Sequence, residues 1–339
     1  MKVSVIIPIY KVEAYIERCA RALMEQTLDD VEFIFVDDCS PDESMKVLES
    51  VLADYPQRKS QTHILRHETN CGLPAARNTG LDAATGDYIF HCDSDDYLEH
   101  DALERMYAKA IETDADIVYS DWYLTFGEGS SRYMSCPEYD TAEKALRGLL
   151  HGSMKYNVWN KLIKRELYYD NLNDNENENE KVRVRVKVKV DSVRFPDGHG
   201  MGEDMTMILL FAKAKKVAYL PICTYHYVRQ NENAFTAVRS EASYENLLFN
   251  ANRVIDALMD KVPEEDLACF KLNTKYPFLI SNRREDYERW HRWFPEANLY
   301  ISSHQVSRRA RFLERVAISK YYWILQIHYV LLQTLLRLA

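Results

Sequence analysis

Three aspartates crowd into four positions directly after an apolar run. The stretch HCDSDDY, residues 91–97, contains Asp93, Asp95 and Asp96. Two carboxylates spaced two residues apart on an extended segment point the same way, and clustered hard oxygens suit Mg²⁺ or Mn²⁺. A divalent cation shared with a diphosphate would offset the mutual repulsion of these carboxylates. A solvated turn with a helix N-cap would use the same residue type, so the stretch alone leaves both interpretations open.

Two further pairs of acidic residues could bind a ligand or transfer a proton. Asp37 and Asp38 end an apolar run, and could accept hydrogen bonds from a base or ribose or serve as turn residues. Glu203 and Asp204 precede an apolar helical pattern. The helix dipole favours an anion there, so we expect a carboxylate that is ionised at neutral pH and can take a proton from a hydroxyl nucleophile. Helix capping is the alternative role for this pair.

The elements that must position these residues alternate between strand and helix. Short apolar runs predict strands at 3–10, 31–36, 62–65, 87–92 and 116–124. Helical spacing predicts helices at 11–28, 73–84 and 102–111, and one more with Ser40 as its N-cap. Such repeated units predict an α/β fold with a mostly parallel sheet covered by helices on both faces. Ligands of these sheets lie outside the carboxyl ends of the strands, where the first two acidic clusters are expected.

The chain divides into two predicted regions. Residues 1–235 form the α/β region, and residues 236–339 are predicted to be helical. Within the first region, residues 171–192 contain the polar repeat NDNENENE and the alternating stretch KVRVRVKVKV. The former is typical of a solvated segment and the latter of a one-faced strand. We interpret the whole stretch as an insertion that forms a surface loop without a catalytic role.

Bulk composition narrows the possible partners. The 339 residues carry a net charge of −9, which gives a nucleic-acid partner little electrostatic support. The seven cysteines form no CxxC pair, and the amino terminus lacks the features of a signal peptide. We therefore expect reduced thiols and a cytoplasmic location.

The carboxyl-terminal segment, residues 308–339, combines a basic start with an apolar end. It holds six basic residues and one acidic residue, and Gln326, His328 and Gln333 interrupt its apolar run. A membrane span needs about 20 predominantly apolar residues, so this segment is no clean span. Three interpretations stay open: a helix packed on the protein, an oligomer contact, or an interfacial helix on the inner face of the cytoplasmic membrane.

Five sequence blocks, taken together, carry a family resemblance. Over residues 3–230 the chain resembles the family 2 glycosyltransferases, which have the GT-A fold. VSVIIPIYKVEAYIERC resembles the opening strand and helix, and QTLDDVEFIFVDDCSPD the second strand and its acidic turn. NCGLPAARNTGLDAATGDYIFHCDSDD resembles the N-G-x-x-x-A-R-N-x-G segment and the DxD metal motif, and VWNKL and GED resemble two later blocks. Five blocks in the family's order are far more specific than a lone DxD.

The resemblance implies a site for a nucleotide-sugar donor. Its nucleotide-binding residues would be Pro8, Tyr10, Asp37, Asp38, Arg77 and Asp93. Pro8 and Tyr10 would line the nucleotide pocket, and Asp38 would face the base, which is uracil if the donor is a UDP-sugar. Arg77 would lie near the donor or order the acidic loop.

The resemblance also implies a metal site and a base. Asp95 would hold Mg²⁺ or Mn²⁺ on the diphosphate, with Asp93 and Asp96 beside it. Asp204 would be the general base, with Glu203 next to it. Family members invert the anomeric centre by direct displacement, so the implied reaction moves a sugar to a hydroxyl of a polysaccharide or lipid-linked glycan without a covalent nucleophile.

The chemistry of the residues agrees with that scheme, and two alternatives remain. Sugar transfer needs charge stabilisation on the leaving diphosphate, one base, and a cleft that excludes water. The stretch PIYKVEAYIE after the first strand has no glycine, which argues against a dinucleotide-binding oxidoreductase. A nucleotidyltransferase that makes NDP-sugars would want a glycine-rich basic loop there. A non-catalytic glycan-assembly scaffold on the same fold would not need both Asp95 and Asp204.

Overall fold

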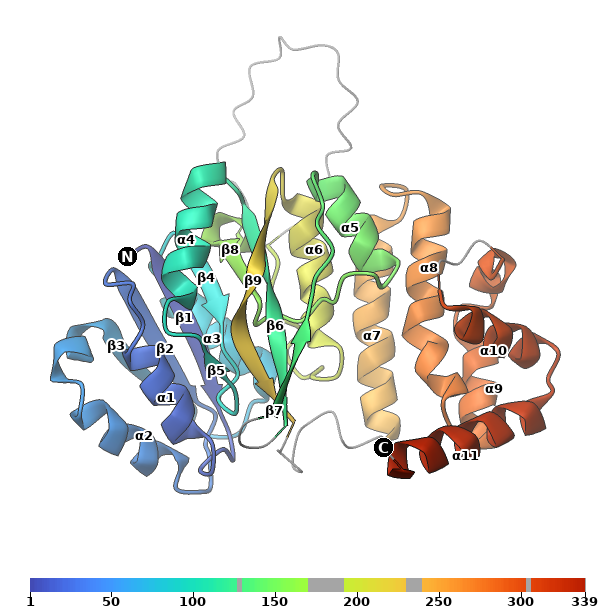
Figure 1. Cartoon of the computed structure of the whole chain (residues 1–339), viewed down its shortest axis with the longest axis horizontal. Coiled ribbons are helices and arrows are strands. Elements are labelled where there is room, and N and C mark those ends of the chain that lie inside the picture. Colours follow the sequence, from blue (N-terminus) through green and yellow to red (C-terminus); the bar gives the residue numbers. More distant parts are fainter. Residues whose placement is uncertain (127–129, 170–191, 230–239, 303–305, 339) are drawn as a thin grey trace, which may run out of the picture. The chain divides into compact units, whose positions relative to one another are not determined.

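A computed structural model describes residues 1–126, 130–169, 192–229, 240–302 and 306–338 (Figure 1). Two predictions fall outside these residues: the insertion at 171–192, apart from Ser192, and the boundary after residue 235. The chain forms two compact units. The first comprises Met1–Leu146 and Tyr156–Val254, and the second Arg147–Lys155 and Ile255–Ala339.

The first unit is built on one mixed sheet with the strand order β3-β2-β1-β4-β8-β6-β9-β5, and β7 pairs with β6. Its strands are β1 (Val3–Ile9), β2 (Val31–Asp37), β3 (Thr62–Arg66), β4 (Tyr88–His91), β5 (Tyr97–Leu98), β6 (Ile117–Phe126), β7 (Ser130–Met134), β8 (Lys161–Lys164) and β9 (Val217–Val228). The first four strands in the chain are parallel, as predicted from their continuous apolar runs. The alternation of these strands with helices confirms the predicted α/β class.

One strand that the sequence did not reveal lies in the middle of this sheet. β8 pairs antiparallel with both β4 and β6. Its sequence, KLIK, has lysine at each end and is too short to show a period. Pairing on both sides nevertheless buries Lys161, which is 1% exposed. The last two residues of the VWNKL block, Lys161 and Leu162, are therefore part of the sheet.

Helices connect the strands of the first unit. They are α1 (Ile16–Met24), α2 (Ser44–Ala53), α3 (Leu73–Ala83), α4 (Ala102–Thr113), α5 (Ala142–Leu150), α6 (Thr206–Lys213) and α7 (Glu241–Leu258), with 3₁₀ turns at Pro56–Gln61, Arg165–Tyr168 and Glu203–Met205. α5 ends in the second unit, and α7 continues into it. α3 packs on β1 so closely that a Cβ at Gly80 would clash with the side chain of Ile6.

Two predicted helix starts are wrong. The helix expected over 11–28 begins only at Ile16, and the helix expected after the cap Ser40 begins at Ser44. The hydroxyl of Ser40 instead accepts a hydrogen bond from the backbone N–H of Lys11 and donates to Asp42. The carboxylate of Asp42 also accepts the backbone N–H of Ser44, so this side-chain network takes over the role of the predicted cap.

The second unit is helical in its described residues. Its helices are α8 (Glu264–Lys275), α9 (Arg284–Arg292), α10 (Arg308–Ile318) and α11 (Tyr322–Leu338), with 3₁₀ turns at Tyr276–Leu279 and Pro295–Tyr300. Its core includes Trp290 and Tyr287, both fully buried. Among the described residues of the whole chain, no helix combines the length and the apolar character that crossing a membrane requires.

Candidate active site

The parallel strands bring the acidic clusters to one edge of the sheet. Asp37 ends β2 and lies opposite Ile9, the last residue of β1. β4 lies on the other side of β1 and ends at His91, just before Asp93. Residues that follow these three strands therefore share the carboxyl edge, where ligands of such sheets bind.

Asp38 is the most tightly held acid at this edge. Its Oδ1 accepts the backbone N–H of Cys71 at 2.8 Å and lies 2.7 Å from Nδ1 of His67. Its Oδ2 accepts the backbone N–H of Gly72 at 2.8 Å. Gly72 has a φ of +90°, a conformation that favours glycine. Asp38 thus ties the loop before α3 to the end of β2.

The residues around Asp38 form a potential metal-ligand group. Ligand atoms of Asp38, His67 and Cys71 lie within 4.8 Å of one another. The second ring nitrogen of His67 is 2.9 Å from the hydroxyl of Thr79. Because these hydrogen bonds already engage Asp38 and His67, the cluster is explained by loop structure without an ion.

The other predicted nucleotide-binding residues lie close by in the chain. Pro8 is buried inside β1, opposite Val36. Tyr10 follows the end of β1, and its side chain is 40% exposed. Asp37 is buried and accepts the backbone N–H of Ser40 at 2.8 Å. Of these three side chains, that of Tyr10 is the one open to a ligand.

Arg77 joins two acidic motifs that are far apart in the sequence. It lies on α3 and is 2% exposed. Its Nη2 donates to Oδ1 of Asp93, and its Nη1 donates to Oε1 of Glu203, each at 2.9 Å. The guanidinium lies 5.3 Å from the ring centre of Phe195. A buried cation is costly without paired charges, so this arginine fixes the DxD turn and the Gly202–Asp204 turn relative to each other.

The three aspartates of the DxD turn have different environments. Asp93 and Asp95 are partly exposed, whereas Asp96 is 1% exposed. Oδ2 of Asp96 accepts the hydroxyl of Tyr225 at 2.8 Å, and its Oδ1 accepts the backbone N–H of Val228 at 2.7 Å. Burial, with the nearby Asp95 and Asp93, raises the pKa of Asp96 well above its usual range. Its carboxyl therefore anchors β9, whereas the other two aspartates remain partly exposed.

The predicted base is not ionised in the way that the sequence suggested. Burial, together with the carboxylate of Glu203, raises the pKa of Asp204 to about 8. Burial also raises the pKa of Glu203, against the effect of Arg77. The expectation that a helix start keeps Asp204 ionised at neutral pH is therefore wrong. A short 3₁₀ turn precedes α6 here, and the loss of solvent around both carboxyls outweighs the helix dipole.

Lys161 is a site residue to which the sequence assigned no role. It lies in β8, and its Nζ donates to the backbone oxygen of Asn157 and to Oδ1 of Asn160. Burial lowers the pKa of Lys161 to about 8, and the thiol of Cys136 and the carboxyl of Asp204 oppose this shift. The cations that act on Asp204 are thus Arg77 and Lys161. The VWNKL block was the signal for this residue, but its burial required the unpredicted strand.

Stacked aromatic rings support the DxD turn from β9. Trp159 stacks on Tyr225 with ring centres 4.6 Å apart, and on Tyr227 at 5.4 Å. Tyr225 accepts the backbone N–H of Asp93 at 3.1 Å while it donates to Asp96. The tryptophan of the VWNKL block therefore acts on the acidic turn through Tyr225.

Comparison with known proteins gives a consistent result. The profile of the family described as "Glycosyl transferase family 2" matches residues 4–172. The chain is 30% identical over 295 residues to an uncharacterized glycosyltransferase, EpsJ, of Bacillus subtilis, covering 83% of this chain and 77% of that protein. It is 26% identical over 241 residues to the glycosyltransferase GlyG of Streptococcus pneumoniae, covering 68% and 71%.

A longer relative also has a solved structure. The chain is 26% identical over 304 residues to the poly(ribitol-phosphate) beta-N-acetylglucosaminyltransferase TarS of Staphylococcus aureus, covering 86% of this chain and 48% of that protein. A crystal structure of TarS residues 1–349 in complex with UDP-GlcNAc superposes with a TM-score of 0.66 at 20% identity, covering 97% of this chain and 91% of that one. This likeness establishes the GT-A fold that the sequence predicted.

Proposed function

The chain belongs to glycosyl transferase family 2 and is a glycosyltransferase, and from that premise we propose that it transfers a sugar from a UDP-sugar to a glycan hydroxyl with inversion. One observation carries this proposal. Arg77, buried on α3, holds the DxD turn through Asp93 and the turn of the predicted base through Glu203. Sugar transfer needs the donor-binding DxD turn and the turn of the base that activates the acceptor to lie side by side.

The choice of a uridine nucleotide draws on the shared fold. TarS, whose GT-A fold this chain shares, has been crystallised with UDP-GlcNAc and with UDP. We assign the nucleoside to the carboxyl edge of β1 and β2, where Tyr10 is exposed and Asp38 holds the loop before α3. Pro8 and Asp37, which are buried, shape this edge from within.

The donor set of the DxD turn fits a divalent cation. Asp95 and Asp93 offer partly exposed carboxylate oxygens, which are the ligands that Mg²⁺ and Mn²⁺ prefer. We propose that these two residues hold the ion, and we leave Asp96 out of the set because both of its oxygens accept hydrogen bonds from β9. When bound, such an ion would neutralise charge on the leaving diphosphate.

Asp204 is the proposed general base. It must be ionised to take the proton of the acceptor hydroxyl, and its pKa of about 8 leaves it mostly protonated at pH 7 in the free protein. Arg77 and Lys161 favour the ionised form. Their charges keep the pKa of this carboxyl near the working range, which is where a general base is most effective.

The acceptor is proposed to be a hydroxyl of a polysaccharide or of a lipid-linked glycan. Relatives that act on poly(ribitol-phosphate) support a polymeric acceptor. The face of α11 supports contact with a membrane surface, because the apolar side chains Trp323, Ile327, Val330, Leu331 and Leu335 are each more than half exposed. They recur at helical spacing, and exposed basic residues lie on α10.

A thermal-shift screen of UDP-, GDP- and dTDP-sugars tests the proposed function. A ligand that binds the folded state raises the melting temperature by mass action. We expect UDP-sugars to raise it by several degrees, with a larger effect when Mn²⁺ is present. Asp95→Asn should lose the additional melting shift that Mn²⁺ produces. The control is Asp101→Asn, which changes an exposed acid before α4 and should keep that additional shift. If no nucleotide-sugar shifts the melt with metal, the proposal fails.

A further inference from the structure

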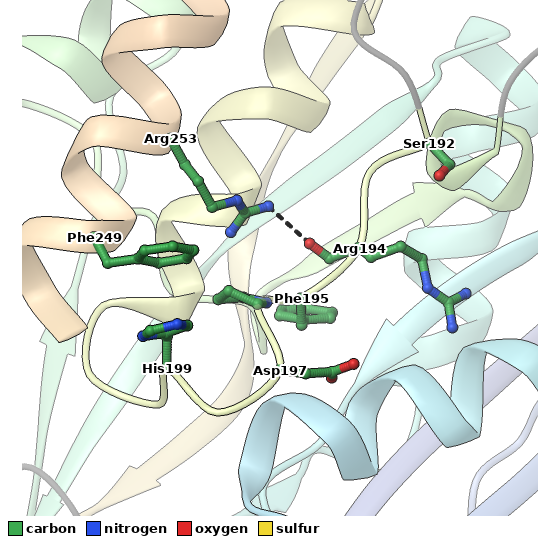
Figure 2. A pocket seen from close by; sticks show the side chains of 8 residues that line it. Ser192, Arg194, Phe195, Asp197, His199, Phe249 and Arg253 are labelled. Atoms are coloured by element: carbon green, nitrogen blue, oxygen red, sulfur yellow. Dashed lines mark hydrogen bonds between the residues drawn. The ribbon is translucent and has the colours of Figure 1, made fainter.

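A pocket outside the proposed donor site lies between the loop 192–199 and α7 in the first unit. It is open to solvent, has a volume of about 310 Å³, and is lined by Ser192, Arg194, Phe195, Pro196, Asp197, His199, Phe249 and Arg253. In Figure 2 Phe249 and Arg253 project from the helix toward this loop. The volume is at the lower end of that of small-molecule sites, and no role has so far been given to this pocket.

One wall of the pocket is an aromatic platform. The rings of His199 and Phe249 stack with their centres 3.7 Å apart at an angle of 12° (Figure 2). Nδ1 of His199 lies 3.1 Å from Oδ1 of Asn246, which fixes the orientation of the ring. Phe249 is 41% exposed although it is a large apolar residue. A flat, exposed ring of this kind suits the C–H face of a sugar ring, which carries a partial positive charge.

Another wall carries the guanidinium of Arg253, which has no acidic partner among the described residues. The guanidinium of Arg253 donates to the backbone oxygen of Arg194 at 2.8 Å, to Oδ1 of Asn250 at 3.2 Å and to the hydroxyl of Thr206 at 3.5 Å. These acceptors are uncharged, and within the described part of the chain no carboxylate pairs with this arginine. Elsewhere in the pocket, Arg194 is paired with Asp82 and Asp197 accepts a hydrogen bond from Asn78. The charge of Arg253 is thus available to an anion.

The pocket is coupled to the proposed catalytic residues through the same loop. Phe195 lies against the guanidinium of Arg77. Asn250 donates to the backbone oxygens of His199 and Met201, just before Glu203 and Asp204. A ligand held by α7 would therefore lie along the segment that leads to the proposed base.

We infer that this pocket is an acceptor subsite that binds a sugar residue carrying an anionic substituent, with the ring on Phe249 and the anion at Arg253. This inference rests on the proposed function, because the ligand is called an acceptor only if the protein transfers a sugar to it. The anion is a phosphate or a carboxylate, since both form charge-assisted hydrogen bonds with a guanidinium. A neutral sugar would use the platform alone.

Saturation-transfer NMR titrations with three probes test the inference. Glucose, glucuronate and glucose 6-phosphate are each added to the full chain. Both anionic probes should bind about tenfold more tightly than glucose, as expected for one charge-assisted hydrogen bond. Phe249→Ala should weaken all three, Arg253→Gln should remove the preference for the anions, and Arg253→Lys should keep part of it. Asn252→Ala, an exposed change in the same helix, should change nothing.

Two outcomes would overturn the inference. One is equal binding of charged and neutral probes, and the other is binding of the anionic probes that survives both Phe249→Ala and Arg253→Gln. Donor binding is measured separately by the UDP-sugar melting shift, which these variants should leave unchanged. A normal donor shift with no probe bound would refute the subsite and spare the proposed function, whereas probe binding without any donor shift would refute sugar transfer and with it the acceptor role.

Discussion

The buried charges around Asp286 and Lys275 in the second unit have partners different in kind from those around Arg77 in the first unit. In the second unit, Asp286 accepts hydrogen bonds from Ser281 and Arg289, which are five and three residues away. Lys275 is fully buried, and its Nζ donates to the backbone oxygens of Trp293 and Phe294 and to Oδ1 of Asn298. These groups hold neighbouring turns together, so their polarity is used within the local structure.

The first unit instead gathers carboxyls around one buried arginine. Arg77 pairs with Asp93, sixteen residues away, and with Glu203, 126 residues away. Asp204 lies beside this pair with its pKa raised to about 8. Such a perturbed group near charged partners is a frequent property of functional sites. The comparison suggests that a buried cation shared by several acids serves chemistry, whereas charges whose hydrogen bonds are satisfied one by one serve structure.

The largest expected effect concerns the base. Asp204→Asn keeps the size of the side chain but cannot accept the proton, so transfer should fall by about 10²- to 10⁴-fold while the UDP-sugar melting shift is retained. Asp286→Asn, the matched change in the second unit, should lower the free energy of unfolding and leave kcat nearly unchanged. The activity of both variants is measured in a sugar-transfer assay, and their stability by urea unfolding. Parental activity in Asp204→Asn would refute the assignment of Asp204 as the base.

Removal of the central cation should have the next largest effect. Arg77→Met leaves the buried carboxyl of Glu203 and the partly exposed carboxylate of Asp93 without their partner, so we expect a loss of roughly 3–5 kcal/mol in the free energy of unfolding. Lys275→Met leaves three neutral hydrogen-bond acceptors without their donor, so the free energy of unfolding should fall by about 1–3 kcal/mol. Equal losses in urea unfolding would break the comparison between the two units.

The pH dependence of transfer should sharpen the comparison further. The pKa of Asp204 rises on folding from 3.8 to about 8. Between these values the folded protein holds a proton that the unfolded chain has released, so this group makes stability fall as pH rises. The ionised, active fraction grows over the same range, and kcat/KM should rise about tenfold per pH unit below a midpoint near 8.

A substitution beside the base tests whether Asp204 sets the midpoint of this pH profile. Glu203→Gln removes the like charge that raises the pKa of Asp204, so the midpoint of the kcat/KM profile should move to lower pH. Glu296→Gln, on an exposed acid of the second unit that pairs with Lys271, should not move it. An unshifted midpoint in Glu203→Gln would mean that another group controls the profile.

The smallest expected effect concerns the exposed face of the second unit. Leu331→Ser combined with Leu335→Ser removes apolar area that is 59% and 66% exposed on α11. Flotation of the full chain with anionic lipid vesicles should decrease at least a few-fold, because each of the two side chains contributes up to about 1.5–3 kcal/mol when it is fully buried. Ile111→Ser, an exposed apolar residue of the first unit at 58%, is the matched control. Unchanged flotation of the double variant would contradict membrane contact.

The sequence by itself determined the class of fold and where the acids meet. Near-continuous apolar runs such as 3–9 and 31–37 favour strands of a buried parallel sheet, and the carboxyl ends of such strands share one edge. This is why Asp38 and Asp93 could be expected together. The order of the five motifs identified the family, because each motif is a short local stretch that can be read from the sequence.

Tertiary structure alone decided how each acid is used. Asp96 turns inward because Tyr225 and Val228, some 130 residues later, supply its hydrogen bonds. The pKa of Asp204 is set by burial and by Glu203, Arg77 and Lys161, of which Arg77 comes from α3 and Lys161 from a strand that has no period to reveal it. The loss of solvent and the distances between charges arise only when distant segments pack, so no local pattern of residues could have shown them.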